Sequence, residues 1–404
     1  MHDLRKAILG EPIVRKVLSA GKEVFLVGGF LRDLLRGVKS RDIDFVVKCN
    51  PKDFLSKTLR DIDGTLVEFR DFAMVRSVLQ DYTLDFTEVK GELEEDLLKR
   101  DFTVNAIAWS AERGIIDPLG GRNDVERGII KAVSEENLID DPLRLLRAYR
   151  LASEIGWDID GETRKMIRKL KGFIRESSSE RITLEIFKLL NSTGHVKALK
   201  QAFIDGLLNE ILYVDKDKLQ DNIKVISSLG RFLKKVPEEL SRREEIFSQG
   251  LTYGGLLRAE QLFYGSDDKK RLSLSRAVSK RLEIISMLLK RYEKKRVVGA
   301  SLVFDLFTTA GDAAMDFALL RQSLRLVKEA ERFLRTPPLL SAEKVMDMTG
   351  LTPGPELGRV LREIKKMQFL NRITNGINAA ERFSLKSHLN QPKPSRTFLA
   401  TDLE

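Results

Sequence analysis

The hydrophobic and polar positions divide the chain into a first third with short apolar runs and a longer remainder with helical periodicity. Strands are predicted where apolar residues form brief runs, or alternate with polar residues, between turn-forming residues. Helices are predicted where apolar residues recur every three or four positions. The predicted strands are Val24–Val27, a strand that carries Asp42 and Asp44, Thr65–Phe69, Ala73–Leu79 and Tyr82–Thr87.

Local signals place helices between these strands. A short helix that carries Arg32 follows the first strand, and Asn50 is a suitable N-cap for a helix that begins at Pro51. From about residue 136 few strand signals remain. We therefore predict an α+β protein, with a mixed-sheet head over 1–135 and an all-helical neck, body and tail. The helical divisions are predicted at 136–200, 201–335 and 336–404, with a mobile stretch from Asn390.

Composition narrows the class of protein. The 404 residues are 42% hydrophobic and 32% charged, which is typical of a globular chain with two or more domains. The single cysteine, Cys49, excludes an intrachain disulfide and a four-cysteine zinc site. No apolar run approaches the length of a membrane span, and the N-terminus lacks an apolar signal core. We expect a cytoplasmic protein that contacts no membrane.

The formal net charge of +10 leaves two interpretations open. Basic proteins often bind nucleic acid, but many bind no anionic partner. Basic clusters occur in the C-terminal half, among them Lys290-Arg291 and Lys294-Lys295-Arg296. Such clusters are usually solvated faces, although one side of them could follow phosphates.

Candidate chemistry is concentrated between residues 24 and 47. Asp42 and Asp44 are two positions apart in a predicted strand, so their side chains share a face, about 7 Å apart along the backbone. Oxygen ligands of this kind suit Mg²⁺. Gly28 and Gly29 would let backbone N–H groups approach a phosphate. Taken singly, a glycine pair is most often a turn, and an Asp-x-Asp pair is most often a solvated strand end.

Together these residues form the pattern GG-x-x-R-D…D-x-D, which resembles the active-site signature of the DNA polymerase β-like nucleotidyltransferase superfamily. KRDFTVNA, from Lys99, and DDPLRLLRAYR, from Asp140, resemble signatures of class II tRNA nucleotidyltransferases and bacterial poly(A) polymerases. Lys99 stands where arginine is commoner, and Asp140 where glutamate is commoner. The resemblance spans residues 28 to 185, and it implies nucleotidyl transfer with Mg²⁺ as cofactor.

The resemblance also implies roles for head residues. Asp42 and Asp44 would hold the metal, and Asp85, on the last predicted strand, is the candidate for a third catalytic carboxylate. Asp101 is expected to orient nearby arginines. The residues implied to contact the triphosphate and ribose can all donate hydrogen bonds: Gly28, Gly29, Arg32, Arg100 and Asn105.

A helix predicted from Pro142, with Asp140 or Asp141 as N-cap, carries the second implied group. Asp141 and Arg144 would read the incoming base, since a carboxylate accepts from an exocyclic amine and a guanidinium donates to ring acceptors. A helix cap with a surface salt bridge is the alternative. Arg147 and Arg150 would add positive charge toward the nucleotide. Arg181 and Glu185, one turn apart on a later helix, are expected to support the base-reading helix.

The length of one connection favours a particular product. The resemblance implies that members which add all of CCA have a long flexible stretch after the strand that matches Tyr82–Thr87. Here little more than Glu88 to Glu92 separates Thr87 from the next predicted helix. We therefore expect a CC-adding enzyme that uses CTP on the acceptor end of tRNA and works alongside a separate A-adding enzyme.

Three alternatives remain at this point. The chain could add all of CCA with CTP and ATP, or it could be a bacterial poly(A) polymerase, which shares every signature above. It could also be a non-catalytic RNA-binding protein on the same fold. That last class predicts the loss of a catalytic carboxylate, whereas Asp42 and Asp44 are both present.

Overall fold

The structure is a computed structural model of the chain, and it describes residues 2–21, 23–60, 64–69, 74–266 and 271–371. Internal contacts divide the chain into two compact units. Unit 1 comprises Met1–Ile226 and Glu245–Ser275, and unit 2 comprises Ser227–Glu244 and Arg276–Glu404. The four-part division predicted from the sequence stays a prediction, and the predicted mobile stretch from Asn390 lies outside the described residues.

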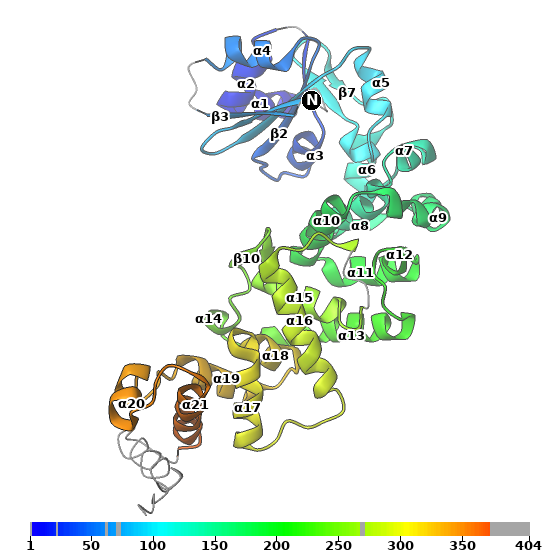
Figure 1. Ribbon diagram of the computed structural model, residues 1–404. Helices are drawn as coiled ribbons and strands as arrows, with labels where there is room; N and C mark the ends of the chain where they lie inside the picture. The colour runs from blue at the N-terminus through cyan, green and yellow to red at the C-terminus, as the bar shows by residue number, and fades with distance from the viewer. Residues whose placement is uncertain (1, 22, 61–63, 70–73, 267–270, 372–404) are drawn as a thin grey trace, which may run out of the picture. The chain divides into compact units, whose positions relative to one another are not determined.

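The N-terminal part of unit 1 contains a mixed sheet flanked by helices (Figure 1). Its seven strands lie in the order β3-β4-β5-β2-β1-β6-β7. Strands β2 and β5 run parallel, and the other neighbouring strands run antiparallel. The strands are β1 (Val24–Val27), β2 (Asp42–Val47), β3 (Thr65–Phe69), β4 (Met74–Val78), β5 (Thr83–Glu88), β6 (Ala108–Ser110) and β7 (Gly114–Ile116). The five predicted strands are therefore confirmed, with end shifts of one residue in β4 and β5. Ala73 lies outside the described residues.

The head core forms where apolar strand residues meet the helices that flank the sheet. Phe45 of β2 stacks on Phe86 of β5 with ring centroids 5.0 Å apart, and Phe54 of α4 lies 5.8 Å from Phe86. Asn50 caps α4 as predicted, because its side chain accepts hydrogen bonds from the N–H groups of two following residues. The head helices are α1 (His2–Gly10), α2 (Pro12–Leu18), α3 (Gly29–Leu35), α4 (Pro51–Thr58), α5 (Leu93–Leu98) and α6 (Gly121–Arg127).

The rest of unit 1 is mainly helical, with two short ladders, β8 (Ile129–Ile130) with β9 (Asp158–Ile159) and β10 (Ile246–Ser248) with β11 (Leu251–Thr252). Helix α8 is central there, since it packs against both α10 and α11. The helices are α7 (Glu135–Asp140), α8 (Leu143–Ile155), α9 (Gly161–Leu170), α10 (Ser179–Asn191), α11 (His195–Ile204), α12 (Leu207–Ile211) and α15 (Tyr253–Leu262), with α13 (Lys216–Leu233) running from unit 1 into unit 2. The predicted α+β class is confirmed.

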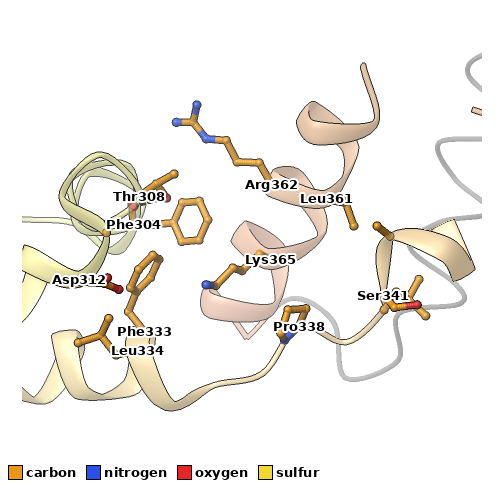
Figure 2. Close-up of a pocket in the computed structure, with 13 residues that line it drawn as sticks. Phe304, Thr308, Asp312, Phe333, Leu334, Pro338, Ser341, Leu361, Arg362 and Lys365 are labelled. Carbon is orange, nitrogen blue, oxygen red and sulfur yellow. Dashed lines mark hydrogen bonds between the residues drawn. The ribbon is translucent and has the colours of Figure 1, made fainter. Parts of the chain in front are cut away.

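Unit 2 is built from helices around a cluster of aromatic rings. Phe304 and Phe333 line a hollow of about 580 Å³ that is bordered by Arg362 and Lys365 (Figure 2). No helix in the described part of the chain has the length and apolar character needed to span a membrane. The remaining helices are α14 (Glu238–Ser241), α16 (Arg276–Arg291), α17 (Ala300–Ala310), α18 (Ala314–Leu320), α19 (Leu324–Arg335), α20 (Ala342–Thr349) and α21 (Pro355–Phe369).

Candidate active site

The three predicted carboxylates gather on neighbouring strands. The parallel register of β2 and β5 places Asp44 opposite Asp85, and Asp42 lies two residues before Asp44 on the same face. Burial raises the pKa of Asp44 despite the opposing charge of Arg100, and the negative charges of Asp85 and Asp42 raise it further. The site therefore concentrates negative charge on one face of the sheet.

The three carboxylates differ in their partners. Asp85 accepts two hydrogen bonds from Arg76, both 2.7 Å long. Among the described residues, the carboxylates of Asp42 and Asp44 accept no hydrogen bond and form no ion pair. Asp42 and Asp44 are thus available to a cation, whereas Asp85 is already paired with the Arg76 guanidinium.

The donor set can be tested against a divalent metal ion. Within the described ranges, no three His, Cys, Asp or Glu side chains are grouped so that they could hold a metal. Two unpaired carboxylates on one face nevertheless suit a hard cation that takes its other ligands from water and substrate phosphates, as Mg²⁺ commonly does. Asp42 and Asp44 fit such an ion; the structure pairs Asp85 with Arg76 instead.

The glycine turn beside these carboxylates has a conformation that requires glycine. Gly28 has a φ of 75°, and its N–H donates to the carbonyl oxygen of Ile107. A Cβ at this position would lie 3.1 Å from both Asp44 Oδ2 and Arg100 Nη1. A side chain at residue 28 would therefore be strained and would crowd the acidic face. Gly29 begins α3 directly after this turn.

Arg32 and Arg100 approach the turn from different elements, and each is held by a carboxylate. Arg32, on α3, donates to Asp33 at 3.0 and 2.9 Å, and its Nη1 donates to Asn105 Oδ1 at 2.8 Å. Arg100 donates to Asp96 at 3.2 and 3.1 Å and to the carbonyl oxygen of Asn105 at 3.4 Å. The structure thus brings together the head residues that were predicted to contact a triphosphate.

Asp101 connects this group to helix α8. It accepts a hydrogen bond from Asn105 Nδ2 at 3.0 Å and two from Arg147 at 3.1 and 2.8 Å. Burial alone would raise the pKa of Asp101, but the charge of Arg147 and these hydrogen bonds hold it below its usual value. Asp101 therefore orients one nearby arginine, Arg147. Arg100 donates to Asp96 and not to Asp101.

The predicted base-reading pair lies at the junction of α7 and α8. Asp141 Oδ2 accepts a hydrogen bond from Arg181 at 2.9 Å and lies 4.0 Å from Arg144 Nε. Arg144 also donates to the carbonyl oxygen of Asn137 at 2.9 Å. Asp141 and Arg144 are therefore neighbours, as their spacing predicted.

The predicted N-cap of α8 is wrong. Pro142 occupies the N-cap position, no side chain caps the helix, Asp140 ends α7, and Asp141 follows as its C-cap. The reason is that the Asp141 carboxylate is turned to Arg181 of α10 and so does not reach the first N–H groups of α8.

Arg150 is nearly as enclosed as Arg32 among the predicted nucleotide-binding arginines. Its side chain is 13% exposed and donates to Glu185 at 2.8 Å and to Glu154 at 2.6 Å. Arg181 and Glu185 thus each contact the region of α8, which agrees with the supporting role expected of them. Nucleotide contact by Arg147 and Arg150 stays a prediction, and the structure places both in ion pairs.

Sequence reasoning missed two partners that shape the site. Arg76 faces Asp85 across the β4–β5 register, which can be derived only after the strands are paired. Asp96 lies one helical turn before Arg100, a spacing that does indicate an ion pair in the sequence.

Comparison with known families agrees with this geometry. The family described as "Poly A polymerase head domain" matches residues 24–93 and 86–131. The family described as "Probable RNA and SrmB- binding site of polymerase A" matches residues 156–214. The first match includes both unpaired carboxylates, the glycine turn and the two arginines beside it.

Similar proteins carry several related names. A "CCA-adding enzyme" of Leuconostoc mesenteroides is 27% identical, over 94% of this chain and 96% of its own. A "CC-adding tRNA nucleotidyltransferase" of Synechocystis is 29% identical, over 87% and 90%. An "A-adding tRNA nucleotidyltransferase" of Deinococcus radiodurans is 27% identical, over 86% and 92%.

Solved structures share the fold. The "Thermotoga maritima CCA-adding enzyme complexed with tRNA_CCA" superposes with a TM-score of 0.75 at 23% identity, over 96% of this chain and 98% of its own. "The complex structure of CCA-adding enzyme with CTP" has a TM-score of 0.76 at 22% identity and covers 98% of both chains. Residues 24–131 thus match the poly(A) polymerase head-domain family, the chain is similar to tRNA nucleotidyltransferases over most of its length, and it is a nucleotidyltransferase enzyme.

Proposed function

We propose that this enzyme adds two cytidines to the 3′ end of tRNA that lacks its CCA terminus, and then stops. The 3′-hydroxyl of the RNA gives up its proton to solvent as its oxygen forms a bond to the α-phosphorus of CTP. The bond from that phosphorus to the α,β-bridging oxygen breaks, and pyrophosphate leaves. The product is one nucleotide longer and offers a new 3′-hydroxyl, so the reaction can repeat.

The acidic face supports nucleotidyl transfer. Asp42 and Asp44 would hold a divalent cation, which we propose to be Mg²⁺, and this charge would stabilise both the attacking and the leaving oxygens. Among the described residues, the two carboxylates accept no hydrogen bond and form no ion pair, so their oxygens can serve as ligands. Asp85, paired with Arg76, would shape the field around them without ligating the ion.

The glycine turn and its arginines would bind the triphosphate. Gly28 leaves the space beside Asp44 open for a phosphate, because a Cβ would occupy it. Arg32 is positioned by Asp33 and Asn105, so its guanidinium does not have to be ordered when the nucleotide arrives. Arg100, fixed by Asp96, would add a second positive charge next to the turn.

Asp141 and Arg144 would select the base without a nucleic-acid template. CTP and ATP both present an exocyclic amine beside an unprotonated ring nitrogen, whereas UTP and GTP do not. A carboxylate and a guanidinium 4.0 Å apart offer one acceptor and one donor to such an edge. Arg181 holds the carboxylate of Asp141 in place, which favours a fixed selection geometry.

The observation that carries the CC-only proposal is the connection between β5 and α5. Strand β5 extends to Glu88, and α5 begins at Leu93, so only residues 89–92 lie between them. Within this connection, the N–H of Val89 donates to Val47 O at 2.9 Å, and Glu92 lies 3.6 Å from Lys48 Nζ.

A connection this short, held by these contacts, cannot form a long flexible loop. Leu93 and Leu97 of α5 are buried in the head core, so the end of the connection is fixed as well. If CCA addition needs a flexible stretch here to reset the pocket from cytosine to adenine, this pocket stays set for cytosine. The similar proteins include CC-adding and CCA-adding enzymes, so full CCA addition is the competing function.

One assay separates the two. A tRNA that ends at its discriminator base is incubated with CTP and ATP together, and the product length is read on a sequencing gel. We expect arrest after two cytidines. Extension by a third nucleotide, an adenosine, would show full CCA addition instead.

Two controls accompany this assay. A tRNA that already ends in CC, with ATP alone, should stay unextended, and it should be extended when a separate A-adding enzyme is supplied. A tRNA given ATP alone from the discriminator base tests the poly(A) polymerase alternative, because only that enzyme would build a run of adenosines.

A further inference from the structure

Three arginines of unit 2 line one surface hollow. Arg296, Arg321 and Arg325 border a space of about 300 Å³ between the loop that follows α16 and the start of α19. The loop belongs to one of the basic clusters noted in the sequence, and it continues the charge with Lys294 and Lys295. The hollow therefore collects guanidinium groups from two separate segments.

The backbone around the hollow is well held. Arg325 Nη2 donates to Val297 O at 2.7 Å, and Arg321 Nη2 donates to Lys295 O at 3.5 Å. Gln322, between the two arginine positions, has a φ of 49°, and its side-chain amide donates to Ser228 Oγ at 2.6 Å. The two arginine contacts tie the loop to the junction between α18 and α19, and the Gln322 contact ties that junction to α13.

The charge of the three arginines is not compensated by any carboxylate in the described part of the chain. In the described ranges, none of the three arginines forms an ion pair with a carboxylate. The acid one turn beyond Arg325 on α19, Glu329, lies 4.0 Å from Arg332 instead. The positive charges that share the hollow repel one another, and a bound anion would relieve this repulsion. The guanidinium N–H groups without a protein acceptor could donate to that anion.

We propose that this hollow binds a backbone phosphate of the RNA substrate, an inference that rests on the proposed function. A guanidinium presents a planar fork of donors that matches phosphate oxygens, and three such groups suit one phosphodiester. The charge also extends beyond the hollow through Lys294 and Lys295, farther than one free phosphate ion would need. A polyanion that passes over the hollow fits this distribution better.

Charge reversal at Arg296 tests the site. Arg296 is exposed, and its side chain makes no hydrogen bond to the described backbone, so Arg296→Glu should leave folding intact. Arg359→Glu is the control for net charge, because Arg359 is an exposed arginine of α21 that pairs with Glu356 and does not line the hollow. Fluorescence anisotropy with labelled tRNA over a KCl series gives the affinity and its salt dependence, and thermal melting checks the fold.

We expect Arg296→Glu to weaken tRNA binding about tenfold and to reduce the slope of log K against log salt by about one, while Arg359→Glu changes neither. In steady-state assays the KM for tRNA should rise, and kcat and the KM for CTP should stay constant. Equal tRNA affinities for the two variants would overturn the proposal. Arg296→Gln, a milder change, should give an intermediate loss.

Two further arms separate related explanations. A short RNA duplex should compete with tRNA for the wild-type protein more strongly than for Arg296→Glu; if only inorganic phosphate binding is lost, the site takes a free anion and the RNA proposal fails. The binding readout does not depend on catalysis. If the wild-type protein fails to extend tRNA, the proposed function is refuted. If Arg296→Glu still weakens RNA binding in that case, the phosphate site is supported independently.

Discussion

The acidic face of the head and the charged helix α8 handle their charges in opposite ways. Among the described residues, the carboxylates of Asp42 and Asp44 accept no hydrogen bond and form no ion pair. On α8, by contrast, Arg147 is bound by Asp101, and Arg150 is bound by Glu185. The difference indicates that the carboxylates of the acidic face are available to a ligand, whereas the charges on α8 stabilise the fold.

The pKa shifts express the same contrast. Burial raises the pKa of Asp44 in the folded protein. The stability that the neutral carboxyl allows is therefore lost as the pH rises through this folded-state pKa. The pKa of Asp101 is lowered, because the charge of Arg147 and its hydrogen bonds outweigh the opposing effect of burial. Ionised Asp101 thus contributes stability that is lost as the pH falls through its folded pKa.

The largest effect should come from removing an unpaired carboxylate. We expect Asp44→Asn to lower the rate of nucleotide addition by about a thousandfold or more, because several kcal/mol of charge stabilisation depend on the metal site. The same change should raise the thermal midpoint at neutral pH, since it removes a charge that burial disfavours. Asp42→Ala should abolish addition as well.

Single-turnover assays and calorimetry measure both quantities, with Asp81→Asn, at an exposed position, as control. Activity within about tenfold of wild type for both Asp42→Ala and Asp44→Asn would contradict the metal assignment. Removing a metal ligand should lower the rate by more than that.

The next largest effect should be a loss of stability on the paired side. The carboxylate of Asp205 is fully covered and accepts hydrogen bonds from Tyr149, Arg164 and Arg168. We expect Asp205→Asn to lower the free energy of unfolding by about 1.5–3 kcal/mol, because it removes the charged acceptor that the buried Tyr149 hydroxyl and two half-buried arginines share. The rate of addition at a temperature where the variant is folded should change little.

The pH dependence of that loss has a defined sign. Burial alone would raise the pKa of Asp205, but the hydrogen bonds from Arg164, Tyr149 and Arg168 hold it below its usual value. The stability it contributes is therefore present above the unfolded pKa and is lost as the pH falls through the folded pKa. Denaturant titrations at neutral and acidic pH should show the difference between wild type and Asp205→Asn shrinking in acid; a constant difference would speak against the charge.

A smaller effect should appear in base selection. We expect Asp141→Ala and Arg144→Ala to reduce the preference for CTP over UTP and GTP by roughly 5- to 150-fold, the range of a base-edge contact. Competition assays with paired nucleotides measure this preference. Arg181→Ala is the informative control, because it removes the partner of Asp141 but no predicted base contact. A uniform loss of rate with unchanged preference would reduce the pair to a structural role.

The smallest effect should come from a pair that is neither enclosed nor near the site. Lys165 and Glu162 form an ion pair on α9, with side chains 64% and 70% exposed. We expect Lys165→Ala to change the free energy of unfolding by less than about 0.5 kcal/mol, because water and salt screen such a pair. A loss comparable to that of Asp205→Asn would break the contrast between enclosed and exposed pairs.

Local chemistry explains why much of the head could be predicted from the sequence. The strand Val24–Val27, the Asn50 cap and the shared face of Asp42 and Asp44 each depend on a few neighbouring residues, through side-chain alternation and the needs of a helix end. The same reasoning gave a wrong cap for α8, because Asp141 is taken by Arg181, 40 positions away.

Tertiary structure alone decided which charges have partners. Arg76 reaches Asp85 only because β4 and β5 pair in one register, Arg147 reaches Asp101 across 46 positions, and Arg296 meets Arg325 at a hollow between two segments. A side chain's residue type fixes what it can bind, and that much is in the sequence. Which group lies within 3 Å of it depends on how distant segments pack, because hydrogen bonds weaken over fractions of an ångström.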